Sequence, residues 1–312
     1  MTLTRQTPVT QDTVEQLVTR IIVLYHANPV DFSNTGKSDG EMHYLNTLKP
    51  TYVRTISDIL SLVADKPHTQ INVLEIGAYL GIVSIALSEL GFKVTATEIP
   101  EYASCPQLIN RLSQANVNLV ACNLKDYQLP FETEQFDIVI SCETLEHLNF
   151  NPLPVFKEIN RVLTVGGALY IATPNLASLS NRLRLWQGHS IHGSVKEFAW
   201  QLDGSKNMIV GIHWREYTGE EIQEMMEMMG FSLAVQRCEV DPADRPLGTN
   251  SGRKMIKDCL HWVFNLPPVK RAVLGCYFDP CDPKLGSTLV SLGRKQHACT
   301  TEFHFTDATL AK

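Results

Sequence analysis

The sequence predicts an α/β fold in which helices flank a mostly parallel, seven-stranded sheet. Three observations indicate this class: short apolar runs rich in β-branched residues recur along the chain, helical patterns separate most of them, and the first five runs are apolar on both faces. Strands that alternate with helices are typical of βαβ units, and strands covered on both sides lack a polar face. The 312 residues are 44% hydrophobic, which is enough apolar material for a substantial core.

Two helices are expected ahead of the first strand. Residues 10–25 carry apolar side chains at helical spacing, and a second apolar stripe follows Pro50. The segments 1–9 and 29–47 are polar and are interpreted as irregular. We interpret residues 1–70 as a helical N-terminal extension that forms a lid.

The elements of the core follow from residue 71. The expected strands are 71–76, 93–99, 117–121, 136–142 and 167–172, with helical patterns between them at 81–90, 106–114 and 153–163. Residues 176–212 hold a helix and a long polar segment, after which Thr218-Gly-Glu-Glu221 forms a capping-box pattern that opens a helix ending at Gly230. Two late strands complete the sheet. The chain then divides into a core at 71–240, an insertion or capping segment at 241–285, a last core strand at 286–296 and a tail at 297–312.

Composition excludes several classes of protein. The 27 Lys and Arg residues against 33 Asp and Glu residues give a net charge of −6, which argues against a nucleic-acid partner because such partners require a basic surface. The eight cysteines form no C-x-x-C pair and are interpreted as thiols in a reducing compartment. Neither a secretory signal nor an apolar stretch of about 20 residues is seen, so we expect a cytoplasmic protein without a membrane span.

A glycine-containing turn after the first strand indicates a ligand site. The segment from Val73 to Gly81 reads as strand, turn and helix start, where free backbone N–H groups and the helix dipole favour a carboxylate or phosphate. A dinucleotide fingerprint G-x-G-x-x-G starting at Gly77 requires glycine where Tyr79 and Ile82 stand. A nicotinamide-dependent oxidoreductase is therefore disfavoured.

The same turn resembles the E-x-G-x-G-x-G loop of class I S-adenosylmethionine (SAM) methyltransferases. Glu75, Gly77 and Gly81 match that pattern, and Tyr79 replaces its middle glycine. The resemblance covers roughly residues 50–240. It implies a Rossmann-like sheet whose last strand is antiparallel, with SAM at the carboxyl ends of the first four strands.

The resemblance also implies the residues that contact SAM. Glu98, at the end of the second strand, is placed to accept both ribose hydroxyls. Asn123 is placed to contact adenine and Leu124 to flank its ring, although Asn123 also reads as a plain turn residue. The expected cofactor-binding set is Glu75, Gly77, Ala78, Tyr79, Gly81, Glu98, Ile99, Asn123, Leu124, Cys142 and Glu143.

The residues after the fourth strand indicate the chemistry. The Asn/Asp-Pro-Pro-Tyr motif of amino-directed DNA and release-factor methyltransferases is absent, and Glu143-x-x-Glu146-His147 stands in its place. This motif resembles O-directed relatives such as the ubiquinone-pathway O-methyltransferases. His147 is a candidate general base because the unperturbed pKa of histidine lies near neutrality.

A metal ion is a second interpretation of the motif. On a helix, Glu143, Glu146 and His147 share one face and can hold Mg²⁺ or Mn²⁺. His213 is a candidate fourth ligand and a second catalytic candidate, because small-RNA 3′-end 2′-O-methyltransferases with E-x-x-E-H supply a later histidine. Such an ion would lower the pKa of a bound hydroxyl. The alternative is a metal-free motif whose Glu–His pair caps a helix or faces solvent.

We therefore expect a SAM-dependent enzyme that methylates a hydroxyl of a small metabolite, lipid or sugar. Two alternatives remain at this point. A metal-dependent RNA 2′-O-methyltransferase is favoured by E-x-x-E-H with His213 and opposed by the acidic charge. A SAM-binding protein without catalysis is opposed by the intact Glu75, Glu98 and E-x-x-E-H. The acceptor and the oligomeric state are left open.

Overall fold

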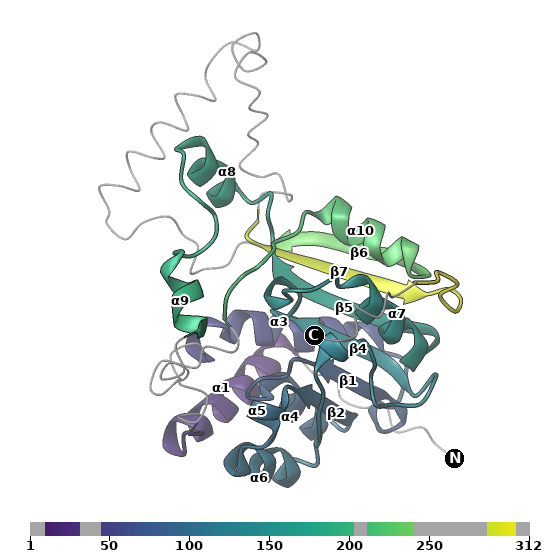
Figure 1. Ribbon diagram of the computed structural model, residues 1–312. Coiled ribbons are helices and arrows are strands. Elements are labelled where there is room, and N and C mark those ends of the chain that lie inside the picture. Colours follow the sequence, from purple (N-terminus) through teal and green to yellow (C-terminus); the bar gives the residue numbers. More distant parts are fainter. Residues whose placement is uncertain (1–9, 32–44, 203–210, 240–285, 304–312) are drawn as a thin grey trace, which may run out of the picture.

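One sheet organises the chain, in the strand order β3-β2-β1-β4-β5-β7-β6 (Figure 1). Its strands are β1 (Asn72–Ile76), β2 (Lys93–Glu98), β3 (Asn118–Ala121), β4 (Phe136–Cys142), β5 (Leu163–Pro174), β6 (Phe231–Glu239) and β7 (Thr288–Lys295). The first five pair in parallel, and β7 lies antiparallel between β5 and β6. The mostly parallel, seven-stranded sheet and its antiparallel last strand are thus confirmed.

The structure, a computed structural model, describes residues 10–31, 45–202, 211–239 and 286–303. The predicted insertion at 241–285 lies outside these residues, so the domain boundaries drawn around it stay predictions. Within the described segments, no helix combines the length and the apolar character needed to cross a bilayer.

Helices cover both faces of the sheet. The first face is covered by α1 (Gln11–Ala27), α3 (Lys49–Leu62), α4 (Ile82–Glu89), α5 (Pro100–Ala103) and α6 (Pro106–Gln114), and the second by α7 (Leu153–Val162) and α10 (Gly219–Met228). Successive strand residues serve opposite cores: Ile138 and Ile140 pack with the first group, and Val139 packs with the second. This two-sided burial is why the strands lack polar alternation.

Two helical segments differ from the expectation. The stretch after β5 contains not only α8 (Leu179–Trp186) but also α9 (Lys196–Leu202), a seven-residue helix that was not predicted within the long segment following α8. In Figure 1 both helices stand beside the sheet, apart from the two covering layers. The strand β5 also begins earlier than expected, at Leu163, because an irregularity opposite Phe136 and Ile138 extends the pairing.

The N-terminal extension packs on the core through α1. Thr10 caps the helix by accepting from the Thr13 N–H at 3.3 Å, and α1 lies against α3 and α4. Near its end, the buried hydroxyl of Tyr25 donates to the carbonyl oxygen of Leu80, in the turn after β1. The extension is therefore attached directly to the turn that the sequence assigns to the cofactor.

The capping box predicted at residues 218–221 is present at the start of α10. The Thr218 side chain accepts from the Glu221 N–H at 3.3 Å, and the Glu221 carboxylate accepts from the Thr218 N–H at 2.8 Å. This reciprocal pair fixes where the helix begins. It also fixes the direction from which residues 211–217 reach the sheet.

Candidate functional site

The turn between β1 and α4 needs glycine at Gly77. Its φ is +69°, and an added Cβ would lie 2.5 Å from Oγ1 of Thr144. Tyr79 adopts φ +52° in the same turn, which is uncommon for a side-chain-bearing residue. Its ring packs edge-on against Tyr102, with 5.7 Å between centroids. The departure from the middle glycine is thus accommodated, because the Tyr79 ring is held by α5.

Two buried carboxylates lie at the end of this turn. Glu98 accepts from the N–H of Tyr79 at 2.6 Å and from its neighbour Ile99 at 2.9 Å, and burial raises its pKa to about 7. Glu75 accepts from the Ser84 hydroxyl, and burial raises its pKa to about 7 against the effect of that hydrogen bond. Both carboxylates can accept hydrogen bonds from hydroxyl or amine groups. A ligand that supplies such groups would therefore stabilise the ionised form of each carboxylate.

The loop after β3 contains Asn123 and Leu124. The Asn123 side chain accepts from the Lys125 N–H at 3.0 Å and caps a short 3₁₀ turn, Leu124–Asp126. Its amide oxygen is therefore engaged in the turn, as the plain turn interpretation of this residue requires. The loop is joined to the cofactor edge because the Cys122 N–H donates to the carbonyl oxygen of Glu98 at 2.8 Å.

The helix α3 has a polar face that was not predicted from the sequence. Among the described residues, the buried Nε of Arg54 and the buried Oγ of Ser57 have no hydrogen-bond partner. Burial raises the pKa of the Cys142 thiol, which Arg54 partly offsets by its charge. Burial likewise raises the pKa of Tyr52, with Glu75 and Glu143 adding to the effect. The spacing of residues 54 and 57, one helical turn apart, was the available signal.

A second cluster forms beyond β4. One donor atom each of Glu146, His147 and His213 lie within 4.8 Å of one another. Glu143, predicted on the same helical face, is not in this group. The reason is local: Glu143 has φ +49°, and a 3₁₀ turn, Leu145–His147, follows in place of an α-helix. The structure thus brings together three of the four predicted metal donors.

Glu146 is completely buried at the centre of this cluster. Its Oε2 accepts from the Thr173 hydroxyl at 3.0 Å, while Oε1 has no hydrogen-bond partner among the described residues. Oε1 lies 3.8 Å from Nε2 of His147. An orphaned, buried carboxylate oxygen is costly unless a further group binds it.

The rings of His147 and His213 both lie near the carboxylate of Glu146. His147 Nδ1 lies 3.1 Å from the carbonyl oxygen of Ile212, so Nδ1 carries the proton and donates. The rings of His147 and His213 meet edge-on, 4.9 Å between centroids. The Trp214 N–H donates to the carbonyl oxygen of Glu146 at 2.8 Å, which ties the two segments together.

His213 has a carboxylate partner of its own. Its Nδ1 lies 3.4 Å from Oε1 of Glu216, and that hydrogen bond raises the pKa of His213 in spite of burial. Burial alone would raise the pKa of Glu216, but hydrogen bonds from His213 and Asn181 lower it below its usual value. The pair therefore favours an ionised carboxylate next to the imidazole.

The donor set fits a divalent ion. Two imidazole nitrogens and one carboxylate oxygen lie close enough to share one, and the orphaned Glu146 Oε1 would gain a partner. Imidazole suits zinc, iron or nickel better than magnesium, which prefers oxygen ligands. The Glu146–His147–His213 cluster is called the two-histidine site below.

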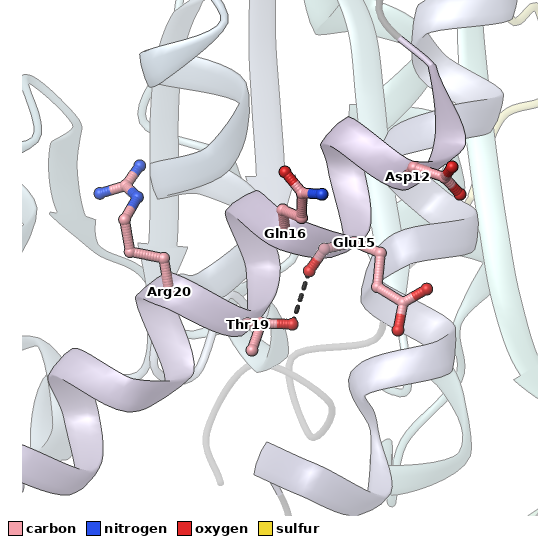
Figure 2. A pocket seen from close by; sticks show the side chains of 5 residues that line it. All are labelled: Asp12, Glu15, Gln16, Thr19 and Arg20. Atoms are coloured by element: carbon pink, nitrogen blue, oxygen red, sulfur yellow. Dashed lines mark hydrogen bonds between the residues drawn. The ribbon is translucent and has the colours of Figure 1, made fainter.

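An additional hollow lies on the outer face of α1 and is lined by Asp12, Glu15, Gln16, Thr19 and Arg20 (Figure 2). Thr19 donates to the carbonyl oxygen of Glu15, Glu15 pairs with Lys49, and Arg20 pairs with Glu89. None of the site residues predicted from the sequence lines it. Glu15 and Arg20 are thus already paired at the surface, and the hollow adds nothing to the site.

A family model described as "Methyltransferase domain" matches residues 47–236. With the fold and the turn after β1, this shows that the chain belongs to the methyltransferase-domain family, as a class I SAM-dependent methyltransferase. The resemblance drawn from Glu75, Gly77 and Gly81 is confirmed. SAM is the cofactor that this class uses.

Curated relatives that match the chain are ubiquinone biosynthesis O-methyltransferases. The mitochondrial ubiquinone biosynthesis O-methyltransferase of Dictyostelium discoideum is 27% identical over 174 residues, which is 48% of this chain and 54% of that protein. The ubiquinone biosynthesis O-methyltransferase of Xanthomonas oryzae is 29% identical over 139 residues, 44% of this chain and 55% of that protein. The chain spans about half the length of these curated relatives.

Among solved structures, a chain of the Haloferax volcanii complex between the Trm112 methyltransferase activator and a methyltransferase is similar, with a TM-score of 0.53. The match covers 86% of this chain and 99% of that chain at 17% sequence identity. At this identity the likeness supports the fold alone.

Proposed function

We propose that this protein transfers a methyl group from SAM to a hydroxyl of a small metabolite, and that the two-histidine site prepares that hydroxyl. One observation carries the proposal: the buried Oε1 of Glu146, without a partner among the described residues, stands beside His147 and His213 at the carboxyl end of the sheet. The names of the curated relatives, ubiquinone biosynthesis O-methyltransferases, support a hydroxyl acceptor.

The cofactor would be held by residues on both sides of the turn after β1. When bound, SAM supplies an electrophilic methyl group on sulfur. Glu98 would accept from the ribose hydroxyls, while Gly77 lets the backbone approach closely. The unpartnered donors of Arg54 and Ser57 suit the carboxylate end of the cofactor. This role for α3 gives the N-terminal extension a part in binding.

The two-histidine site would act on the acceptor. When bound, a divalent ion lowers the pKa of a coordinated hydroxyl and orients it. Glu146 and the two Nε2 atoms would hold that ion, and the Thr173 hydroxyl and Ile212 carbonyl keep Glu146 and His147 oriented. In-line transfer then depends on the distance between this site and the cofactor turn, which the parallel strands β1 and β4 fix.

The surface above this site favours a small organic acceptor over RNA. Trp214 follows His213 directly, and its ring stacks on Phe198 of α9 with 5.3 Å between centroids and 7° between planes. Both rings are partly exposed and offer an apolar wall for an acceptor. The net charge of −6 opposes a polyanionic substrate.

The test is transfer of label from methyl-labelled SAM into fractions of metabolites, lipids, glycans and RNA, with and without added Mn²⁺ or EDTA. We expect label in a hydroxylated small molecule and loss of transfer with EDTA. Label in RNA would overturn the acceptor class. Transfer that is insensitive to EDTA would leave His147 as a metal-free base and overturn the metal centre.

A further inference from the structure

We propose that Glu216 is a positioning residue that fixes the tautomer and orientation of His213, and that Asn181 holds Glu216 for this task. The inference rests on the proposed function, because it names the residues that orient a histidine of the two-histidine site. Neither residue belongs to the E-x-x-E-H motif or to the cofactor turn. Both act through His213.

The contact between Glu216 and His213 determines which ring nitrogen is available. Glu216 Oε1 lies 3.4 Å from His213 Nδ1, and the side chain is only 8% exposed. An ionised carboxylate accepts hydrogen bonds and donates none, so Nδ1 must carry the proton. In the neutral imidazole the lone pair is then on Nε2, the nitrogen needed by a metal ion or by a hydroxyl proton.

The other carboxylate oxygen is occupied by α8. Asn181 Nδ2 donates to Glu216 Oε2 at 2.7 Å and to the carbonyl oxygen of Asn175 at 3.1 Å. Asn175 is 2% exposed and forms a bridge with Tyr217. Glu216 is thus held from both oxygens by elements anchored at the end of β5, so its direction toward His213 is fixed.

His147 shows the same arrangement with a different acceptor. Its Nδ1 donates to the carbonyl oxygen of Ile212, as His213 Nδ1 donates to Glu216. Two histidines that arrive from distant segments are therefore each oriented through Nδ1. Metal-ligating histidines are held in this manner, and loss of such an outer partner typically lowers metal affinity 10- to 100-fold.

The experiment measures Co²⁺ binding to the full chain by its visible absorption and by calorimetry. Glu216→Gln should weaken Co²⁺ binding roughly 10- to 100-fold and change the absorption spectrum. The amide of that variant would turn its oxygen to His213 and set its NH₂ against the NH₂ of Asn181. Glu216→Leu removes the acceptor altogether at similar side-chain size, so it should weaken Co²⁺ binding at least as much.

Glu224→Gln, on the exposed side of α10, is the matched control and should leave binding unchanged. Wild-type affinity and spectrum in both Glu216→Gln and Glu216→Leu would overturn the positioning role. If the wild-type protein binds no Co²⁺, the proposed metal centre fails separately. The ¹⁵N shifts of His213 then decide the present inference: a single Nδ1–H tautomer in the wild type that becomes a mixture in Glu216→Leu supports it, and an unchanged tautomer contradicts it.

Discussion

The backbone N–H of Tyr79 donates to Oε1 of Glu98 at 2.6 Å, so the carboxylate that ends β2 also holds the turn that follows β1. Tyr79 has φ +52°, a conformation that costs on the order of 1 kcal/mol for a residue with a side chain. The hydrogen bond and the Tyr102 contact offset this cost. The hydrogen bond between Tyr79 and Glu98 therefore fixes both the shape of the turn and the position of the carboxylate that we assign to the cofactor.

Binding of S-adenosylhomocysteine, the product form of the cofactor, should strengthen as the pH rises from 6 to 8. Burial raises the pKa of Glu98 from 4.5 to about 7, and ribose hydroxyls donate to the ionised form. The same shift means that ionisation of Glu98 lowers the stability of the ligand-free protein between pH 4.5 and 7, because the folded state binds the extra proton there. Calorimetry across pH measures the affinity. Glu98→Gln should remove most of the dependence, and a Glu98→Gln profile equal to that of the wild type would contradict the assignment.

Gly77→Ala should lower the affinity for S-adenosylhomocysteine at least 10-fold. The new Cβ would lie 2.5 Å from Thr144 Oγ1 in the turn. Gly166→Ala is a matched control, because Gly166 also has a positive φ of +79° but has no atom within 4 Å of the added Cβ. Both variants carry similar backbone strain. Equal affinities in the two would mean that the close packing at Gly77 does not affect the cofactor.

Tyr25→Phe should weaken cofactor binding as well as the fold. It removes the buried hydrogen bond to the Leu80 carbonyl oxygen, a loss of about 1–2 kcal/mol in the free energy of unfolding. Tyr170→Phe removes the 2.8 Å hydrogen bond to Asp58 instead, which lies outside the turn. Chemical denaturation and calorimetry should show similar stability losses, with reduced affinity only in Tyr25→Phe. Unchanged affinity in Tyr25→Phe would mean that the N-terminal extension does not influence cofactor binding.

The E-x-x-E-H motif should divide into one carboxylate that binds metal and one that does not. Glu146→Gln should abolish binding of Mn²⁺ or Co²⁺, because Glu146 belongs to the two-histidine site. Glu143→Gln should retain it, since Glu143 is turned out of that site by its φ of +49°. Metal analysis after dialysis, with matched circular dichroism, distinguishes the two variants. Equal losses would restore the four-ligand arrangement predicted from the sequence.

The aromatic wall should affect the acceptor and not the cofactor. Trp214→Ala should raise the KM of an identified acceptor several-fold and leave the KM of SAM unchanged, because the Phe198–Trp214 stack borders the two-histidine site. Trp186→Ala removes a tryptophan that is 84% exposed on α8 and serves as the control. A larger effect of Trp186→Ala on the acceptor KM would mean that the acceptor does not bind against the Phe198–Trp214 stack.

Much of the core could be predicted because buried parallel strands have a simple pattern. Apolar runs predicted the strands, and the position of Glu98 at the end of β2 made it a candidate for binding the cofactor. The helical face drawn through Glu143, Glu146 and His147 did not form, because a left-handed residue at Glu143 has no sequence signature when it is not glycine. The helix α9 was missed because its seven residues are too few to show a helical periodicity.

The two residues that we propose to position His213 could not be predicted from the sequence either. Asn181 and Glu216 meet only because α8 and the segment after it both return to the end of β5. Arg54 and Ser57 are polar positions within an apolar stripe, and their importance depends on which atoms are left without a partner after folding. Contacts of this kind depend on tertiary packing, which local patterns do not encode.

The bridge between Asn175 and Tyr217, together with the hydrogen bond from the Leu176 N–H to the Tyr217 carbonyl oxygen, closes the intervening segment at its base. Residues of α9, which lie between these two points, can change in composition while Asn181, Glu216 and His213 keep their contacts. Under the proposed function, the residues of α9 that would contact the acceptor are thereby separated from the residues that would prepare its hydroxyl. A lineage with this arrangement can acquire new acceptors by altering α9 alone, without rebuilding the reaction centre.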